Sequence, residues 1–300
     1  YSSAASDVYK RQMLETCMRI PDWVVYTVVL IAVITTLFVR GGEDEDIGRI
    51  PSPFDVSEPD PSLMEPGPAL PDPDPFDEKV LVQVGSAEDG IGTAFAVNRS
   101  GAWLTARHVV DGCSRIGLVV GGGRLAMVDD VRTSTDSDLA LLFTERAPRA
   151  LSLDLDRELR IGDAGYHVGF PQGNSGEASS QLLARSQLVT RGRYQLEEPV
   201  LAWVETGRSG AIEGSLAGMS GGPVFDADGS VVGVTVAESP RRGRIYTAAP
   251  GSIERFLDSQ GLITPESEAT PLAAASYARE ADRLRRELAV VKVVCRVGGL

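Results

Sequence analysis

From Lys79 onward, the chain is a series of short apolar runs separated by glycine-rich turns. The runs are rich in β-branched residues: VLVQVG, TAFAVN, AWLTA, IGLVVGGG, DLALLF, AGYHVGF, LAWVETG, GGPVF, SVVGVTVA and RIYTAA. Many short strands at near-regular spacing are typical of a barrel or a sandwich. The series ends near SIERFLDSQG, which predicts a short closing helix. We therefore expect one all-β domain over residues 79–260, long enough for two packed barrels.

The pattern changes in residues 261–300. Tyr277, Ala281, Leu284, Leu288 and Val291 follow one another at spacings of four and three, with Arg and Glu between them. This spacing predicts an amphipathic helix with a two-heptad seam. The seam either docks on the domain or pairs with a second chain, so an oligomer through this helix is one alternative. We expect a tail here, which a truncated sequence would also produce.

Residues 23–39 form an uncharged apolar run, WVVYTVVLIAVITTLFV. As a helix it would span about 25 Å, near the lower limit for crossing a bilayer. A signal peptide would have a shorter apolar run and a cleavage site of small residues, and a core helix would be amphipathic. We therefore expect a single-pass membrane anchor. Arg19 precedes the run and Arg40 follows it, so charge does not define its orientation.

The sequence begins without Met, and the first candidate start is Met13. Residues 1–12 are interpreted as a non-native scar and are excluded from fold reasoning. Residues 13–22 then form a short N-terminal tail before the apolar run.

Charge is concentrated in one short part of the chain. The formal net charge is −13, but residues 41–78 hold 12 acidic residues, one basic residue and nine of the 18 prolines. Such a composition cannot bury apolar surface, and its prolines disrupt helices and sheets. We expect residues 40–78 to be an extended acidic linker with a reach of about 35 to 120 Å; an acidic docking site is the alternative. An acidic chain also disfavours nucleic acid as a partner.

Three cysteines, Cys17, Cys113 and Cys295, are too few and too scattered to predict a disulfide framework. Cys113 has no obvious partner nearby in the sequence. We predict no metal site and no cofactor.

Three segments carry candidate chemistry. His108 follows a predicted strand in GAWLTARHVV, Asp136 and Asp138 precede a buried strand in DSDLALLF, and Ser220 lies among glycines in GMSGGPVF. A serine hydroxyl needs a base to become a nucleophile, and histidine is suited to that role near neutral pH. A carboxylate holds the histidine in the correct tautomer. We therefore predict a triad of His108, Asp138 and Ser220.

The order of these residues separates the classes of serine hydrolase. GMSGG also matches the nucleophile elbow of α/β-hydrolases, but that fold needs a histidine after the serine, and none follows Ser220. It also needs a helix after the elbow, where this sequence predicts strands. A subtilisin-like order would need an aspartate before His108, where most acids belong to the predicted linker.

Together these motifs resemble the trypsin-like (chymotrypsin-fold) serine peptidases over residues 80–258, in particular the bacterial HtrA/Deg branch. The segments that carry the resemblance are GIGTAFAV, LTARHVV, DSDLALL, GYHVGFPQG and GMSGGPVFDADGSVVGV. The resemblance implies two six-stranded antiparallel β-barrels with the active site between them. It also implies an oxyanion hole formed by the N–H groups of Gly218 and Ser220. The tail is too short for the PDZ domain that usually follows.

The sequence departs from the digestive enzymes of this family. Met219 stands where those enzymes have the aspartate that binds a freed N-terminus, so we do not expect activation by propeptide cleavage. By the same resemblance the pocket floor falls near Gly214 and Ser215 with no clear acid, which favours a small or apolar P1 residue. His167 lies in a predicted strand of the second barrel and is interpreted as structural.

We therefore predict a membrane-anchored serine endopeptidase that acts on polypeptides in envelope protein quality control or regulated proteolysis. Its protease domain would be periplasmic or otherwise extracytoplasmic. The alternative is a catalytically silent pseudoprotease or a peptide-binding sensor that uses the same cleft.

Overall fold

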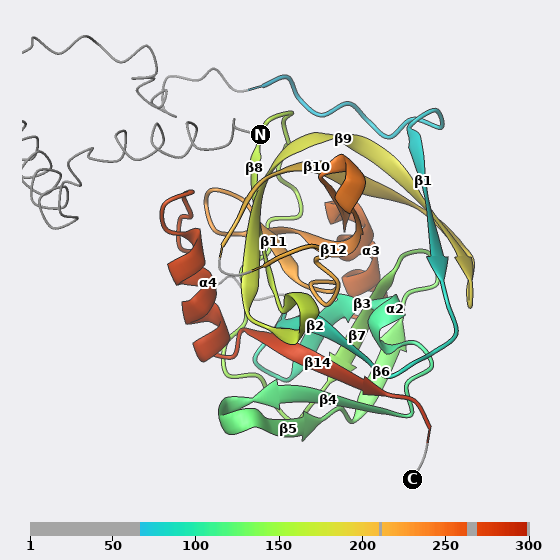
Figure 1. Ribbon diagram of the computed structural model, residues 1–300, viewed down its shortest axis with the longest axis vertical. Helices are drawn as coiled ribbons and strands as arrows, with labels where there is room; N and C mark the ends of the chain where they lie inside the picture. Colours follow the sequence, from blue (N-terminus) through green and yellow to red (C-terminus); the bar gives the residue numbers. More distant parts are fainter. Residues whose placement is uncertain (1–66, 210–211, 263–268, 299–300) are drawn as a thin grey trace, which may run out of the picture. The chain divides into compact units, whose positions relative to one another are not determined.

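A computed structural model describes residues 67–209, 212–262 and 269–298 (Figure 1). The predicted scar, N-terminal tail and apolar run at residues 23–39 lie outside the described residues. No helix in the described part of the chain is long and apolar enough to span a bilayer.

The described residues form two seven-stranded sheets, as the strand-rich pattern predicts. The strands of the first sheet are β2 (Gly90–Ala96), β3 (Ala102–Ala106), β4 (Arg115–Val120), β5 (Arg124–Met127), β6 (Asp130–Thr133), β7 (Leu139–Phe143) and β14 (Val290–Arg296). Those of the second are β1 (Glu78–Val84), β8 (Ala164–Gly169), β9 (Gly176–Gly192), β10 (Leu196–Arg208), β11 (Pro223–Phe225), β12 (Val231–Ser239) and β13 (Arg244–Ala248).

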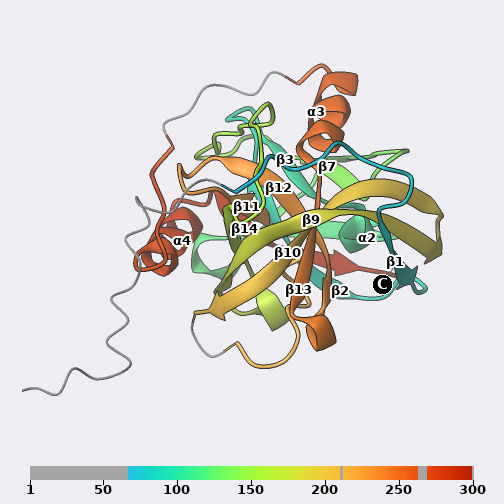
Figure 2. The same ribbon diagram turned by 90° about the horizontal axis from the view of Figure 1, so that it is seen from above.

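The helices are few and short. The described residues include α2 (Arg107–Val110), α3 (Pro250–Ser259) and α4 (Tyr277–Arg286), with 3₁₀ turns at Gly121–Gly123, Pro171–Gly173 and Pro240–Arg242. Helix α3 is the closing helix that the sequence predicts, and it buries Ile253, Phe256 and Leu257. Helices α3 and α4 lie on different sides of the sheets (Figures 1 and 2).

The second sheet contains a ring of six strands. Because β8 pairs with both β9 and β11, the order β8-β9-β10-β13-β12-β11 closes on itself. Strand β1 adds to the outside of this ring by a parallel pairing with β9. The ring agrees with the expected six-stranded barrel, but β1 makes the sheet larger than expected.

The first sheet differs from the expected six-stranded barrel. Its strand order is β5-β4-β14-β2-β3-β7-β6, and β5 and β6 form its two edges. The additional strand is β14, which comes from the predicted tail and pairs antiparallel with both β2 and β4. The expected domain boundary at residue 260 therefore does not describe the fold, because residues 290–296 supply a middle strand.

The predicted amphipathic helix is present but shorter than its heptad spacing indicates. Helix α4 ends at Arg286, and Leu288 has a φ of 56°, a left-handed backbone that ends the helix. Tyr277, Ala281 and Leu284 are buried in the domain itself. The apolar seam thus packs on its own chain, which favours the docked alternative, and an oligomer through this helix stays a prediction.

The C-terminal part of the predicted acidic linker packs on the second sheet. The N–H of Leu70 donates to the carbonyl of Leu159 at 2.8 Å, and Leu70 is buried. Arg185 donates to the carbonyl of Pro71 at 2.5 Å. The expected linker boundary at residue 78 is therefore too late, because one apolar side chain and backbone hydrogen bonds hold the segment in place from residue 67.

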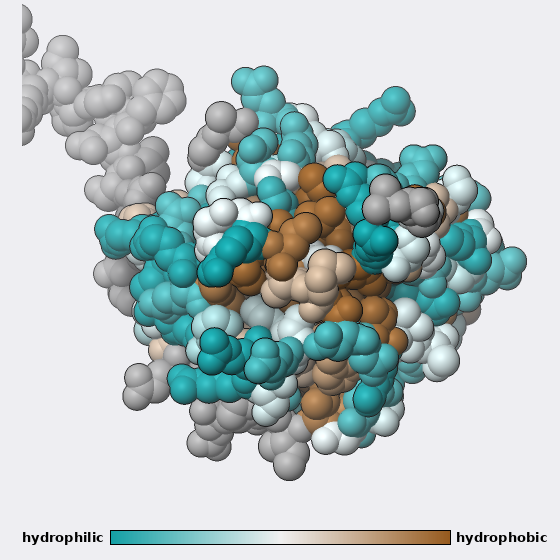
Figure 3. Space-filling view, turned by 90° about the horizontal axis from the view of Figure 1, so that it is seen from below, coloured by the Kyte–Doolittle hydropathy of each residue, from teal (hydrophilic) through white to brown (hydrophobic). Residues whose placement is uncertain are grey.

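The core is shared between the two sheets. Strands β3 and β7 are buried on both faces, as their continuous apolar runs indicate. A second apolar cluster fills the six-strand ring, and Met219 is fully buried in it. The outer face of the first sheet is also partly apolar, with Ile91, Leu125 and Met127 exposed. Seen from below, the domain gathers apolar surface in its middle (Figure 3).

A disulfide joins Cys113 to Cys295 across 182 residues, with their Cα atoms 5.5 Å apart. Cys113 has no partner nearby in the sequence, but the pairing of β14 with β4 brings it to Cys295 from a distant segment. The bond ties the segment after α2, the helix that carries His108, to β14.

Reduction of this disulfide is expected to destabilise the domain. Releasing so long a loop is worth about 5 kcal/mol in the chain-entropy model, and measured losses are roughly 2–5 kcal/mol. Denaturant unfolding with and without a thiol reductant measures the change. In the Cys295→Ser variant the reductant should have no further effect. Equal stability of the oxidised and reduced wild type would contradict the prediction.

Candidate active site

His108 lies in the single helical turn α2, which directly follows β3 and borders the cleft. Strand β3 is fully buried and ends at Ala106, which is the N-cap residue of α2. Val109 and Val110 turn into the core, whereas the His108 side chain is 25% exposed. The N–H of Arg107 donates to the carbonyl of Asp138 at 3.0 Å, which fixes this turn against the start of β7.

Asp138 receives hydrogen bonds from both the backbone and the ring of His108. Its Oδ1 accepts from the His108 N–H at 2.9 Å, and its Oδ2 lies 2.6 Å from Nδ1. Burial opposes protonation of His108, but the charge of Asp138 and its hydrogen bond outweigh burial, so the pKa of His108 is raised. The predicted His108–Asp138 pair is present in the structure. The neighbouring acid of the same motif, Asp136, is exposed and accepts from the Ser134 hydroxyl.

Ser220 lies in a tight loop that glycine permits. Gly218 and Gly221 have φ values of 99° and 84°, where other residues are strained. A Cβ at Gly221 would lie 2.2 Å from Thr105 Oγ1, so only glycine allows this approach to β3. Between them, the buried side chain of Met219 anchors the loop in the six-strand ring.

The peptide groups of this loop are oriented by hydrogen bonds. The Ala217 carbonyl accepts from the N–H of Gln172 at 2.6 Å, and the Met219 carbonyl accepts from Gly222 at 2.8 Å. In a trans peptide the next N–H points the opposite way. Among the described residues, neither the N–H of Gly218 nor that of Ser220 has a hydrogen-bond acceptor. Both are therefore available as donors, as the resemblance implies.

Thr93 on β2 connects the first sheet to this loop. Its N–H donates to the Ser220 carbonyl at 2.9 Å, and its Oγ1 donates to the Gly218 carbonyl at 2.8 Å. The Thr105 hydroxyl in turn donates to the Thr93 carbonyl at 2.6 Å. Sequence reasoning missed Thr93, because nothing local to GIGTAFAV distinguishes this threonine from one that only packs.

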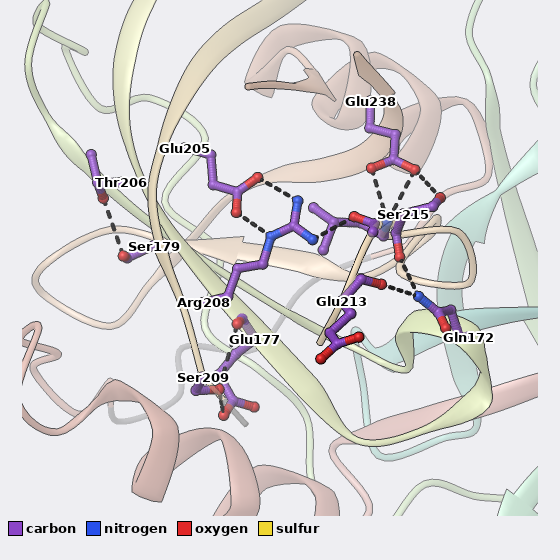
Figure 4. A network of polar contacts seen from close by, with 12 residues as sticks. Gln172, Glu177, Ser179, Glu205, Thr206, Arg208, Ser209, Glu213, Ser215 and Glu238 are labelled. Carbon is purple, nitrogen blue, oxygen red and sulfur yellow. Dashed lines mark hydrogen bonds and ion pairs between the residues drawn. The ribbon is translucent and has the colours of Figure 1, made fainter. Parts of the chain in front are cut away.

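A second group of contacts holds the segment that leads into the loop (Figure 4). Gln172 Nε2 donates to the carbonyls of Glu213 at 2.6 Å and Ser215 at 3.0 Å. The Glu238 carboxylate accepts the Leu216 N–H at 2.9 and 3.0 Å and also bonds to the Ser215 hydroxyl. The segment before Ser220 is thus pinned on two sides.

His108 and Ser220 line one cleft of about 470 Å³. Its other walls include the end of β1, the start of β2, Ala217 and Gly218, and residues 236–238 of β12. Within the described residues no hydrogen bond joins His108 to Ser220. The structure thus brings His108 and Asp138 into contact and places Ser220 on the same cleft.

Comparison with known proteins identifies this region. Residues 92–234 match the family model described as a trypsin-like peptidase domain. This region, the peptidase domain, is therefore similar to trypsin-like peptidases. Its matched residues include His108, Asp138 and Ser220.

The peptidase domain has relatives among curated bacterial proteases. A probable periplasmic DegP-like serine endoprotease of Bartonella henselae is 29% identical over 161 residues, which cover 52% of this chain and 30% of the relative. The putative serine protease HhoA of Synechocystis is 30% identical over 154 residues, which cover 49% of this chain and 37% of the relative. The matches therefore span about a third of the length of these relatives.

Solved structures also align with the peptidase domain. The active form of the Rv3671c protease from M. tuberculosis aligns with a TM-score of 0.47 and 16% identity, over 70% of this chain and all of that one. The HtrA-type protease AlgW with a decapeptide aligns with a TM-score of 0.45 and 24% identity, over 56% of this chain and 50% of that one.

The pocket region of the peptidase domain contains an acid that sequence reasoning missed. Glu238 lines the cleft, and its carboxylate bonds to Ser215 at the predicted pocket floor. The expectation that no acid lies near Ser215 is wrong, because β12 returns Glu238 to this loop from 23 residues away. The carboxylate oxygens of Glu238 already accept hydrogen bonds from Ser215 and Leu216. The preference for a small or apolar P1 residue stays a prediction.

His167 lies away from the cleft. It is fully buried in β8, and its Nε2 lies 2.7 Å from Ser180 Oγ. Burial lowers its pKa to about 3, so it is neutral near pH 7. In the described part of the chain no three His, Cys, Asp or Glu side chains lie close enough to share a metal ion.

Glu198 is a buried carboxyl group behind Asp138. It is 0% exposed, and its Oε1 accepts the Asp138 N–H at 2.8 Å. Burial, and secondarily the charge of Asp138, raise its pKa to about 8. An unfolded chain would lose this proton near pH 4.5. The folded state therefore binds the proton more tightly, and stability falls as pH rises between these two values.

Glu198→Gln is therefore expected to gain stability relative to the wild type as pH rises from about 5 to about 8, by at most about 5 kcal/mol. Below that range the difference should be small, because the wild-type carboxyl is neutral in both states. Denaturant unfolding across this pH range measures the trend. Glu197→Gln, at an exposed neighbour on β10, is the control. A pH-independent difference between Glu198→Gln and wild type would contradict the prediction.

Proposed function

We propose that the chain is a serine endopeptidase of the HtrA/Deg type, with His108, Asp138 and Ser220 as its triad. The observation that carries this proposal is one cleft lined by Ser220 and by a histidine bonded to a buried aspartate. Beside it are two N–H groups that find no acceptor in the described part of the chain. A buried aspartate beside a histidine supports the imidazolium that forms during acyl transfer.

In this mechanism Ser220 attacks the carbonyl carbon of the scissile peptide bond. His108 Nε2 accepts the serine proton, since its Nδ1 is held by Asp138. The carbonyl oxygen becomes negative, and the N–H groups of Gly218 and Ser220 stabilise it. His108 then gives the proton to the leaving amine, and water attacks the acyl-enzyme by the same route in reverse.

An extended polypeptide fits the free edge of β12. Residues 236–238 line the cleft, and among the described residues Ala237 and Glu238 pair on one side only, with β13. The other edge can pair with a substrate backbone, which gives affinity without dictating sequence. This favours polypeptide substrates with loose sequence requirements, as protein quality control would need.

We also propose that the domain works outside the cytoplasm, held at a membrane by residues 23–39. The disulfide between Cys113 and Cys295 supports an oxidising compartment. Relatives described as periplasmic endoproteases favour the same compartment. The uncharged apolar sequence of residues 23–39 is the support for the anchor.

A fluorophosphonate probe tests the proposed chemistry directly, because it labels only an activated serine. The full wild-type chain is expected to become labelled, whereas Ser220→Ala should stay unlabelled. His108→Ala should also lose labelling, since it removes the base. Circular dichroism shows whether each sample is folded. A folded wild-type chain that does not label would refute the endopeptidase and favour a peptide-binding pseudoprotease.

A further inference from the structure

The hairpin between β9 and β10 belongs to the second sheet but contacts the histidine and aspartate carried by the first. Arg193 at its tip donates to the His108 carbonyl at 3.2 Å and forms an ion pair with Asp111 at 2.9 Å. Tyr194 and Glu198 both contact Asp138. Three side chains from a six-residue stretch of the hairpin thus contact either His108 or Asp138.

Tyr194 determines how the two oxygens of Asp138 are used. Its hydroxyl donates to Oδ1 at 2.8 Å, and the His108 N–H donates to the same oxygen. Oδ2 is left for the ring Nδ1 of His108. The Arg107 guanidinium lies 4.2 Å from the centre of the Tyr194 ring, which holds the ring in place. Burial raises the pKa of Tyr194, so the hydroxyl keeps its proton and stays a donor.

Glu198 holds the backbone of the same aspartate. Its Oε1 accepts the Asp138 N–H, while its Oε2 is buried and has no hydrogen-bond partner among the described residues. A carboxyl group with one unpaired oxygen is a costly way to fill a core position. An apolar side chain would fill the same volume but would leave the Asp138 N–H without an acceptor.

We propose that Tyr194 and Glu198 are positioning residues that hold Asp138 in register with His108. The histidine–aspartate pair of one sheet is then set by a hairpin of the other, and the pair is correctly oriented only while the hairpin is docked. This inference rests on the proposed endopeptidase function, but the placement of the pair can be measured without catalysis.

Tyr194→Phe removes one hydroxyl and keeps the ring beneath Arg107. We expect kcat on a peptide substrate to fall roughly 10- to 100-fold, as for loss of a hydrogen bond to a charged group, with KM unchanged. Tyr166→Phe removes a hydroxyl from a buried tyrosine that packs on Tyr277 and is the matched control. A folded Tyr194→Phe enzyme with the kcat of the control would overturn the role of Tyr194.

The conservative variant separates positioning from packing at Glu198. Glu198→Gln keeps an oxygen that can accept the Asp138 N–H, so kcat near pH 7 should stay within about threefold of wild type. Glu198→Leu keeps the volume and loses the acceptor, so kcat should fall at least tenfold. Equal kcat values for the two variants, when both are folded, would overturn the role of Glu198.

Titration of His108 by NMR supplies a readout that does not depend on turnover. The chain has two histidines, and His167 is buried with a pKa of about 3, so a ring that titrates near neutral pH is His108. Without the Tyr194 hydroxyl, more of the Asp138 charge acts on His108, and its pKa should rise in Tyr194→Phe. The other charged and titratable groups around the pair are unchanged in this variant: Arg107, Asp111, Arg193, Asp136 and Glu198.

The two readouts separate the two proposals. An inactive wild type whose His108 pKa still differs between wild type and Tyr194→Phe would refute the endopeptidase and support the positioning role. An active wild type with an identical His108 pKa and identical kcat in Tyr194→Phe would overturn the positioning role alone.

Discussion

Ser220→Ala is expected to lower kcat for peptide hydrolysis by about 10⁴ to 10⁶. The alanine removes the nucleophile, whereas Met219 still anchors the loop in the core and the N–H groups of Gly218 and Ser220 keep their orientation. Substrate affinity should therefore remain. Hydrolysis of casein and self-cleavage of the full chain measure the loss.

Ser259→Ala is the matched control for this variant. Ser259 is an exposed serine at the end of α3, and its hydroxyl donates to the Phe256 carbonyl and accepts from the Gln260 side chain, both far from the cleft residues in the chain. The Ser259→Ala variant should hydrolyse casein at the wild-type rate. Comparable casein hydrolysis by Ser220→Ala and wild type would show that the nucleophile is another residue.

Asp138→Asn is expected to lower kcat by about 10⁴ while the domain stays folded. The Asp138 carboxylate accepts from the His108 N–H, the His108 ring and the Tyr194 hydroxyl. An amide of the same shape has one oxygen, which the first and third donors would use. Its NH₂ group would then face Nδ1 and stabilise the wrong tautomer of His108, with a proton on Nε2 where the base is needed.

Asp136→Asn tests whether the loss of kcat in Asp138→Asn comes from the contact of Asp138 with His108 or only from removing one negative charge near the cleft. Asp136 lies two residues away, and its side chain is 61% exposed. It should keep kcat within about twofold of wild type, because surface charges contribute little. Steady-state kinetics on one peptide substrate compares the two variants. A similar loss in both would mean that net charge near the cleft, and not the histidine tautomer, controls the rate.

The parts of the fold that depend on local pattern were predictable. Continuous apolar runs such as AWLTA and LALLF indicated buried strands, and SIERFLDSQG indicated α3. His108 and Asp138 could be paired because both follow or precede such a strand and because serine chemistry needs a base and a carboxylate.

The parts that depend on long-range pairing were not predictable. VVKVVCR alternates weakly, and nothing near it in the sequence shows that it pairs with both β2 and β4. The partner of Cys113 follows from that pairing alone. Tyr194 and Glu198 were missed for the same reason, since their contacts with Asp138 cross 56 and 60 residues.

The place of β14 in the first sheet has a consequence for biosynthesis. A chain emerging from the ribosome exposes β2 and β4 long before residues 290–296 exist to lie between them. The sheet that carries His108 therefore waits for a strand about 170 residues beyond β4, and such non-local pairing is intrinsically slow to form. A nascent chain with this topology cannot complete its first sheet, and so cannot seat His108 in a finished sheet, until residues 290–296 have been made.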